Sequence, residues 1–179
     1  MAVDTVTLFF ALLAVFAAAG TLAVGLSAVA GDRLGLRSAV GPVGLELAAA
    51  VAVTATLGSL YLSEVAGYAP CRLCWVQRAF MYPGAVLLPL AIVTRNRWPA
   101  LVAAGLAVPG LAVAVFHRYE QASGGEPGFC DPAVPCTFRW VDHFGFVTIP
   151  TMAAVAFAAV AVLVAVSPSA TGATQTRGD

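Results

Sequence analysis

Residues 76–94 read VQRAFMYPGAVLLPLAIVT, and this segment decides the class of fold because nearly all of it is apolar. Its one charged side chain, Arg78, lies in the first turn, and Arg95 follows its end. The segment has about the 17–25 residues that a helix needs to cross the hydrocarbon core of a bilayer. We therefore predict a transmembrane helix here.

Four more apolar stretches of similar length lie on either side of this segment. They cover residues 6–30, 45–62, 99–117 and 144–166. Of the 179 residues in the chain, 60% are hydrophobic and 10% are charged, whereas an average soluble chain is about 25% charged. The sequence therefore predicts an all-α membrane protein with five crossings. The net charge is zero and no basic block is present, which excludes an electrostatic surface for nucleic acid.

The first stretch, residues 6–30, has a second interpretation. Its last residues, Ala28-Val29-Ala30, resemble the small-residue cleavage site of a secretory signal peptide. However, the preceding residues carry no positive charge, and the apolar run is longer than the roughly 7–15 residues of a signal-peptide core. We therefore favour an uncleaved transmembrane helix.

The charged residues suggest how the chain is oriented. If the N-terminus is outside the cell, the cytoplasmic loops carry a net positive charge and the outer loops a net negative charge. The compact turn Arg95-Asn96-Arg97-Trp98 is the best single anchor for a cytoplasmic loop, because arginines near helix ends favour that side. We expect residues 1–44 to form one transmembrane helix and a cytoplasmic loop, and residues 167–179 to form a disordered polar tail.

The four cysteines all lie outside the apolar stretches. Cys71 and Cys74 precede the third stretch, and Cys130 and Cys136 lie between the fourth and the fifth. With five crossings, both loops lie on the same side of the membrane. The even number and the two close pairs favour disulfides, which persist on the oxidising side. This placement agrees with an outer N-terminus.

Three kinds of site fit these cysteines. A zinc site needs two closely spaced pairs, but the separation of Cys130 and Cys136 is wider than the common spacing of about two to four residues. Two structural disulfides are the second possibility, although a Cys-x-x-Cys disulfide closes a very small loop and removes little unfolded-state entropy. A redox pair is the interpretation that we favour, because enzymes open and close such tight disulfides.

The residues around Cys71 and Cys74 support a redox site. Both thiols lie where the third helix begins, and there the free N–H groups and the helix dipole favour a thiolate. Arg78 lies one turn beyond Cys74 on the same helix face. A cation there lowers the pKa of a thiolate and stabilises negative charge on a bound acceptor. Taken alone, Arg78 fits equally an arginine that reaches the lipid headgroups.

A longer pattern contains these residues. LGSLYLSE at residues 57–64, PCRLCWVQR at 70–78 and MYP at 81–83 resemble the DsbB family of disulfide-bond-formation membrane proteins, especially its BdbC-like branch. VPC at 134–136 and FGFVTIP at 144–150 resemble the same branch, as does the short segment between Cys130 and Cys136. The resemblance implies a DsbB-like bundle of four transmembrane helices over residues 45–166. The helix at residues 6–30 is then an addition to the family core.

The resemblance also implies a thiol:quinone oxidoreductase in the plasma membrane, with its redox site on the extracytoplasmic face. A reduced thioredoxin-fold (DsbA-like) thiol oxidase attacks Cys130, and Cys136 then exchanges with Cys71. Cys74 faces the ring of a membrane quinone, either menaquinone or ubiquinone, with Arg78 beside a quinone oxygen. Cleavage after residue 30 would instead deliver all four cysteines to the reducing cytosol, so the redox interpretation requires the uncleaved helix.

Two more residues are candidates for the quinone site. Trp75, together with Phe80 and Tyr82, is placed to line an apolar slot, and an interfacial aromatic belt is the alternative role. His117, at the outer end of the fourth stretch, titrates nearest to physiological pH and is the best-placed proton donor. Its alternative role is an interfacial histidine bonded to a carbonyl or to water.

Two other functions compete with this one. A vitamin K epoxide reductase-like protein also couples cysteines to a quinone, but in that family the loop cysteines precede the Cys-x-x-Cys, and here they follow it. A non-enzymatic multi-pass protein would use the cysteines as structural disulfides or as metal ligands. The order of the cysteines and the pattern around them favour the DsbB-like oxidoreductase.

Overall fold

The computed structural model describes residues 3–33, 35–125 and 128–168. Its helices are α1 (Val3–Val29), α2 (Leu36–Val40), η1 (Gly41–Val43), α3 (Gly44–Leu60), η2 (Tyr61–Val65), α4 (Arg72–Thr94), α5 (Trp98–Ser123) and α6 (Ile149–Val166). Within the described residues, five helical stretches are long and apolar enough to cross a membrane, the second running from Leu36 to Val65. The predicted all-α membrane fold is confirmed.

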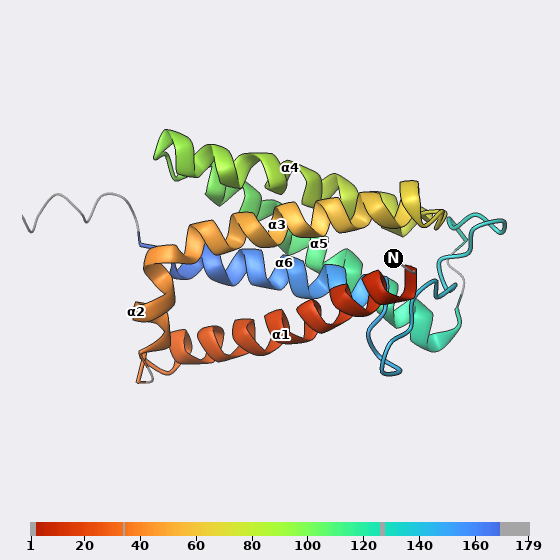
Figure 1. Ribbon diagram of the computed structural model, residues 1–179, viewed down its shortest axis with the longest axis horizontal. Coiled ribbons are helices and arrows are strands. Elements are labelled where there is room, and N and C mark those ends of the chain that lie inside the picture. Colours follow the sequence, from red (N-terminus) through yellow and green to blue (C-terminus); the bar gives the residue numbers. More distant parts are fainter. Residues whose placement is uncertain (1–2, 34, 126–127, 169–179) are drawn as a thin grey trace, which may run out of the picture.

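The long helices run side by side along the longest axis of the molecule (Figure 1). α3, α4, α5 and α6 form a bundle in which each helix packs against two neighbours, α3 and α5 lying between α4 and α6. The additional helix α1 packs against α6, outside this bundle, and the short α2 crosses the end of the molecule to join α1 to α3. The expected four-helix bundle with one added N-terminal helix is therefore confirmed.

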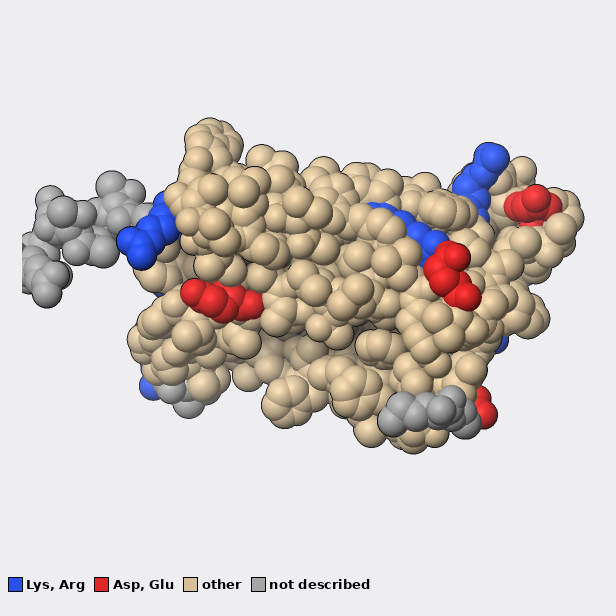
Figure 2. Space-filling view, turned by 45° about the horizontal axis from the view of Figure 1, so that its top comes forward, with Lys and Arg blue, Asp and Glu red and all other residues tan. Residues whose placement is uncertain are grey.

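The beginning of α1 lies at the same end of the molecule as the loop that carries Cys130 and Cys136 (Figure 1). A hydrogen-bond contact of 3.1 Å between Thr7 Oγ1 and His143 Nε2 joins that loop to α1. Charged side chains lie toward the two ends, and the middle of the face in Figure 2 is uncharged. This distribution is the one that a membrane-spanning bundle requires.

Small side chains bring the four helices of the bundle together. Ala48 and Ala52 of α3 and Ala103 and Ala107 of α5 are all buried in one core. In a bilayer, small interface residues let helix backbones approach closely, so that van der Waals packing replaces the hydrophobic drive of a soluble core. Larger side chains such as Phe157 then fill the space left between the helices.

The opposite end of the molecule is held by Arg97. Its guanidinium donates to the backbone oxygen of Ser167 at 2.7 Å and to that of Val164 at 3.1 Å. These carbonyls belong to the last turn of α6, where backbone oxygens lack helical partners. The turn that the sequence assigned to the cytoplasm thus connects α4 to α5 and also caps α6.

Several helix boundaries differ from the sequence-based ones. The fifth apolar stretch covers residues 144–166, and its helix, α6, begins at Ile149, with Pro150 as its second residue. Phe144 and Gly145 before it have positive φ angles and form a turn. α5 continues to Ser123, well beyond residue 117. The predicted loop at the end of residues 1–44 contains α2, and most of the predicted tail, residues 169–179, lies outside the described residues.

The contact between α5 and α6 at Gly110 gives a first prediction. A Cβ atom at Gly110 would overlap the ring of Phe157, which is buried. We expect Gly110→Ala to lower the free energy of unfolding by about 1–3 kcal/mol, the usual effect of overpacking. Thermal unfolding of the purified protein in detergent measures it.

Gly105→Ala is the matched control, because a Cβ at Gly105 of the same helix would meet open space. Alanine is the better helix former by roughly 1 kcal/mol, so this variant should be at least as stable as the wild type. Equal melting temperatures for the two variants would contradict the packing argument.

Candidate functional site

The N-terminus of α4 presents the first cysteine pair. Cys71 is the N-cap of this helix, and its sulfur accepts a hydrogen bond from the backbone N–H of Cys74 at 3.3 Å. An N-cap that satisfies a free N–H group stabilises the first turn. The two sulfurs are free thiols and lie 2.9 Å apart. The pair therefore lies at the positive end of the α4 dipole, as the sequence predicted.

The second pair, Cys130 and Cys136, forms a disulfide in the loop between α5 and α6. Cys136 is completely buried, whereas Cys130 is partly exposed. A turn between them is held by the side chain of Asp131, which accepts from the backbone N–H of Ala133 at 2.9 Å. Of the two sulfurs, Cys130 is therefore the more accessible to another protein.

The two pairs meet in one buried cluster. Cys71, Leu73 and Cys136 form its centre, and Cys74 and Cys130 pack around them. The disulfide takes two of the four thiolates that a four-cysteine zinc site would need, so this arrangement does not fit that site. The structure instead juxtaposes one disulfide and one dithiol, which is the arrangement that thiol–disulfide exchange requires.

His117 lies between the two pairs and is 2% exposed. Its Nε2 is 2.9 Å from the backbone oxygen of Cys136 and 3.7 Å from the sulfur of Cys71. A carbonyl oxygen only accepts, so Nε2 carries the hydrogen. Gln77 then donates its amide N–H to Nδ1, at 2.8 Å. The side chains of α4 and α5 thus hold the backbone of the cysteine loop beside Cys71.

Gln77 was not among the residues that the sequence singled out. The signal was present, because a polar side chain within an apolar span needs a partner, and Gln77 follows Cys74 by three residues on the same helix face. Ser59 was also missed, although it lies in the run that resembles the DsbB family. Neither residue has a charge or a sulfur to mark it as chemically active.

The surroundings of Cys71 lower the pKa of its thiol to about 4. The hydrogen bond from the Cys74 thiol is the largest cause, burial opposes it, and His117 lowers the pKa further. With this pair reduced, Cys71 is therefore a thiolate at neutral pH. The assignment of the quinone-facing thiolate to Cys74 stays a prediction.

Arg78 is 9% exposed and is held by α3. Its Nε donates to Ser59 Oγ at 3.0 Å and its Nη2 to the Ser59 backbone oxygen at 2.9 Å. The guanidinium also lies 5.1 Å from the ring centre of Trp75. Among the described residues, the only ion pair joins Arg139 to Asp142, so Arg78 has no carboxylate partner there. A buried cation of this kind favours a bound group with negative or partly negative oxygen.

A cavity of about 540 Å³ borders this site. Its lining at one end includes Ser59, Cys74, Gln77, Arg78 and Tyr82. The rest of the wall is mostly apolar and comes mainly from α1, α3 and α6. The volume falls within the range of roughly 300–1,000 Å³ that is usual for small-molecule sites.

Not every residue predicted for the quinone site lines this cavity. Trp75 is 58% exposed and lies outside the lining, as an interfacial aromatic belt would place it. His117 borders a much smaller cavity of about 20 Å³ on the other side of the cysteines. Phe80 packs against the bundle core, whereas Tyr82 does line the large cavity. The structure thus separates the surroundings of His117 from those of Arg78.

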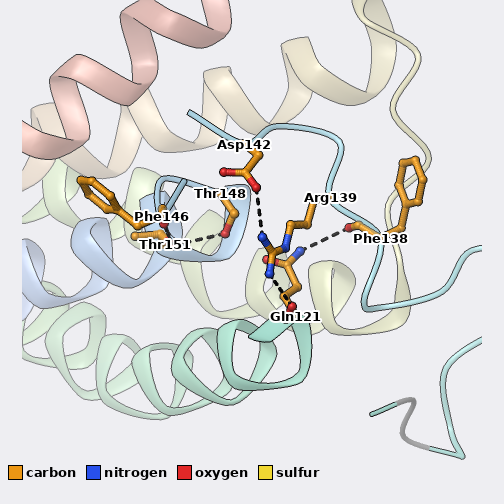
Figure 3. Close-up of polar contacts among 7 residues, drawn as sticks. All are labelled: Gln121, Phe138, Arg139, Asp142, Phe146, Thr148 and Thr151. Carbon is orange, nitrogen blue, oxygen red and sulfur yellow. Dashed lines mark hydrogen bonds and ion pairs between the residues drawn. The ribbon is translucent and has the colours of Figure 1, made fainter. Parts of the chain in front are cut away.

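The second half of the cysteine loop is anchored to the helices on either side (Figure 3). Arg139 pairs with Asp142 at 3.0 Å and donates to the backbone oxygen of Gln121 at 2.6 Å. The Gln121 side chain donates in turn to the backbone oxygen of Phe138 at 3.2 Å. The rings of Tyr68 and Trp140 stack at 5.0 Å, so the loop also packs against the segment that leads into α4. These contacts fix the position of the buried Cys136.

Comparison with known proteins gives the family. The model described as "Disulfide bond formation protein DsbB" matches residues 43–167, more than half of the chain. The chain belongs to the DsbB family. It is therefore a multi-pass membrane protein of disulfide bond formation, as the cysteine pattern indicated. The match covers α3 to α6 and leaves out α1 and α2.

Curated DsbB-family relatives show the same coverage. Disulfide bond formation protein C of Bacillus subtilis is 38% identical over 109 residues, which are 60% of this chain and 79% of that protein. "Probable disulfide formation protein C 1" of Bacillus anthracis is 41% identical over 110 residues, with the same shares. The "Probable disulfide formation protein" of Oceanobacillus iheyensis is 39% identical over 115 residues, or 63% of this chain and 79% of that protein. No solved structure matches the chain.

The low pKa of Cys71 gives a second prediction. In the protein with Cys130 and Cys136 oxidised and the other pair reduced, ultraviolet absorbance of the thiolate should persist at neutral pH and disappear near pH 4. Cys74→Ala removes the largest stabilising contact and His117→Leu removes the next. In both variants we expect the transition to move to higher pH, toward the pKa of about 8.5 of an ordinary thiol.

Tyr119→Phe is the control for this titration, because Tyr119 is exposed on the same helix as His117. It should titrate as the wild type does. A wild-type transition near the pH of an ordinary thiol would contradict the assignment of the thiolate to Cys71.

Proposed function

We propose that this protein is a thiol:quinone oxidoreductase of the plasma membrane, with its cysteines on the extracytoplasmic face. It reoxidises a DsbA-like thioredoxin-fold protein and passes the electrons to a membrane quinone. One observation carries the proposal: a disulfide and a dithiol share one buried cluster, and Cys74 of the dithiol borders an apolar cavity that also contains Arg78.

The first step takes place at the loop disulfide. A thiolate of the reduced partner attacks the accessible sulfur of Cys130, the Cys130–Cys136 bond breaks, and Cys136 leaves as a thiolate. The second thiol of the partner then displaces Cys130 from the mixed disulfide, which releases the oxidised partner. Two electrons and two protons have moved from the partner to the loop pair.

The second step moves the electrons to α4. The Cys136 thiolate of the reduced loop pair attacks the Cys71–Cys74 disulfide and forms a transient Cys136–Cys71 bond, and Cys74 leaves as a thiolate, which takes up the proton released from the loop pair. Cys130 then attacks Cys136, which restores the loop disulfide and leaves Cys71 and Cys74 reduced. The structure corresponds to this state. The position of Cys71 and Cys136 in one cluster supports direct exchange between them.

The quinone site fits the residues that line the large cavity. When bound, a quinone takes up two electrons and two protons, and Cys71 and Cys74 become a disulfide again. Arg78, which lacks a carboxylate partner among the described residues, would hold a quinone oxygen, and the ring would lie beside Cys74. His117 Nε2 donates to the backbone oxygen of Cys136 and lies 3.7 Å from the sulfur of Cys71, to which it would relay a proton. Menaquinone and ubiquinone both satisfy these requirements.

The third prediction concerns the oxidation of a reduced thioredoxin-fold partner in the presence of a quinone. We expect the purified wild-type protein to catalyse this reaction and Cys74→Ser to abolish it, because a serine oxygen cannot form the disulfide. Ser63→Ala, at a partly exposed position outside the cavity lining, is the control and should retain wild-type activity. Full activity of Cys74→Ser, or wild-type activity without any quinone, would overturn the proposal.

The difference in exposure between Cys130 and Cys136 gives a fourth prediction. A thioredoxin-fold partner that has lost its second active-site cysteine cannot complete the exchange, so its mixed disulfide accumulates. We expect peptide mapping by mass spectrometry to find this bond predominantly on Cys130, because Cys136 is completely buried. A mixed disulfide found predominantly on Cys136 would contradict the proposal that the partner attacks Cys130 first.

A further inference from the structure

The additional helix α1 forms one wall of the large cavity. Phe10, Ala14, Ala17, Gly20 and Val24 of α1 all line it. Their spacing of three or four residues places them on one face of the helix. All five precede residue 43, where the family match begins. This wall is therefore supplied by a part of the chain that lies outside the DsbB-family match.

α1 approaches α3 near the cysteines and lies farther from the bundle toward α2 (Figure 1). Near the cysteines, the Phe10 ring packs on Gly58 of α3, 3.1 Å from where a Cβ would lie. At the far end the cavity reaches Leu47 and Leu163. The space-filling view shows the surface hollowed between these helices (Figure 2). The cavity is thus an elongated slot beside the redox site.

The slot is long, and its lining is polar at one end and apolar along the rest of its length. Its lining on α6 extends from Ile149 to Leu163, and at 1.5 Å per residue this corresponds to about 20 Å. The polar groups of Cys74 and Arg78 lie at one end, and the walls beyond them are apolar. A ligand that fits has a compact polar head and a long apolar chain.

We infer that this slot binds the isoprenoid side chain of the quinone, with α1 as the wall that separates the chain from bulk lipid. The inference rests on the proposed function, because it takes the quinone ring to lie at Cys74 and Arg78. Continuity between the slot and the redox site supports this occupant over a phospholipid, since the acyl chains of a phospholipid carry no group for Cys74 to reduce. Small residues at Ala17 and Gly20 leave room for the chain.

Two substitutions that add the same side chain test this inference. Gly20→Leu fills the slot, because Gly20 lines it and a Cβ there meets open space. Gly25→Leu is the matched control, since Gly25 also faces open space on α1 but does not line the slot. Ala17→Leu, one turn nearer the cysteines, provides a second filling variant. Gly→Leu improves helix propensity, so neither glycine variant is expected to impair folding.

The measurement is the dissociation constant of two quinones, from quenching of tryptophan fluorescence in the full-length protein, since Trp140 lines the slot. The two are a menaquinone with its prenyl side chain and menadione, which has the same ring without it. Gly20→Leu and Ala17→Leu should weaken menaquinone binding roughly tenfold, as expected if two methylene groups are expelled from the slot. Menadione binding should be unchanged, and Gly25→Leu should bind both as the wild type does.

The possible results separate this inference from the proposed function. Menadione turnover by all variants, combined with equal menaquinone affinity in Gly20→Leu and wild type, would overturn the tail site and leave the oxidoreductase intact. Loss of co-purified phospholipid from Gly20→Leu without a change in menaquinone affinity would assign the slot to an acyl chain instead. Failure of the wild type to bind or reduce either quinone would remove the proposed function, and the tail site with it.

Discussion

The hydrogen bonds of one buried imidazole join the two cysteine pairs. His117 is held by Gln77 on one nitrogen and by the backbone oxygen of Cys136 on the other, so α4, α5 and the cysteine loop are joined at one point. At the edge of a membrane, few waters are available to replace such partners, and an unsatisfied polar group costs several kcal/mol. The loop is thereby kept against the start of α4, and Cys136 against Cys71.

Arg78 imposes a second constraint on the other side of the cysteines. A buried guanidinium is expensive to desolvate, and Ser59 together with the Trp75 ring offsets only part of that cost. Arg78 also lines the large cavity, where its remaining N–H groups would donate hydrogen bonds to an oxygen of the proposed quinone. The site therefore has two polar systems, to which the proposed function assigns thiol exchange and the electron acceptor, and Cys74 borders both cavities.

The sequence predicted the membrane crossings because they follow from local hydropathy. It placed all four cysteines on one side because an even number of spans separates their two loops. Cys71, Cys74 and Arg78 were found for the same reason, since their relation is set by the geometry of one helix. The contact of His117 with Gln77 could not be found this way, because it depends on how α4 and α5 are rotated against each other. The same holds for the cavity, whose walls include α1, a helix that the family pattern does not contain.

The low pKa of Cys71 agrees with the direction of electron flow that we propose for the site. A contact that stabilises the thiolate stabilises the reduced form of the pair, and a dithiol favoured in this way has an oxidising disulfide. A thiolate of low pKa is also a weak nucleophile, so Cys71, once reduced, attacks the loop disulfide slowly. The Cys74 and His117 contacts that lower this pKa are internal to the cluster and remain when the partner has left. In the proposed cycle, the oxidised loop beside a reduced Cys71–Cys74 pair is thus the state in which the electrons have reached α4.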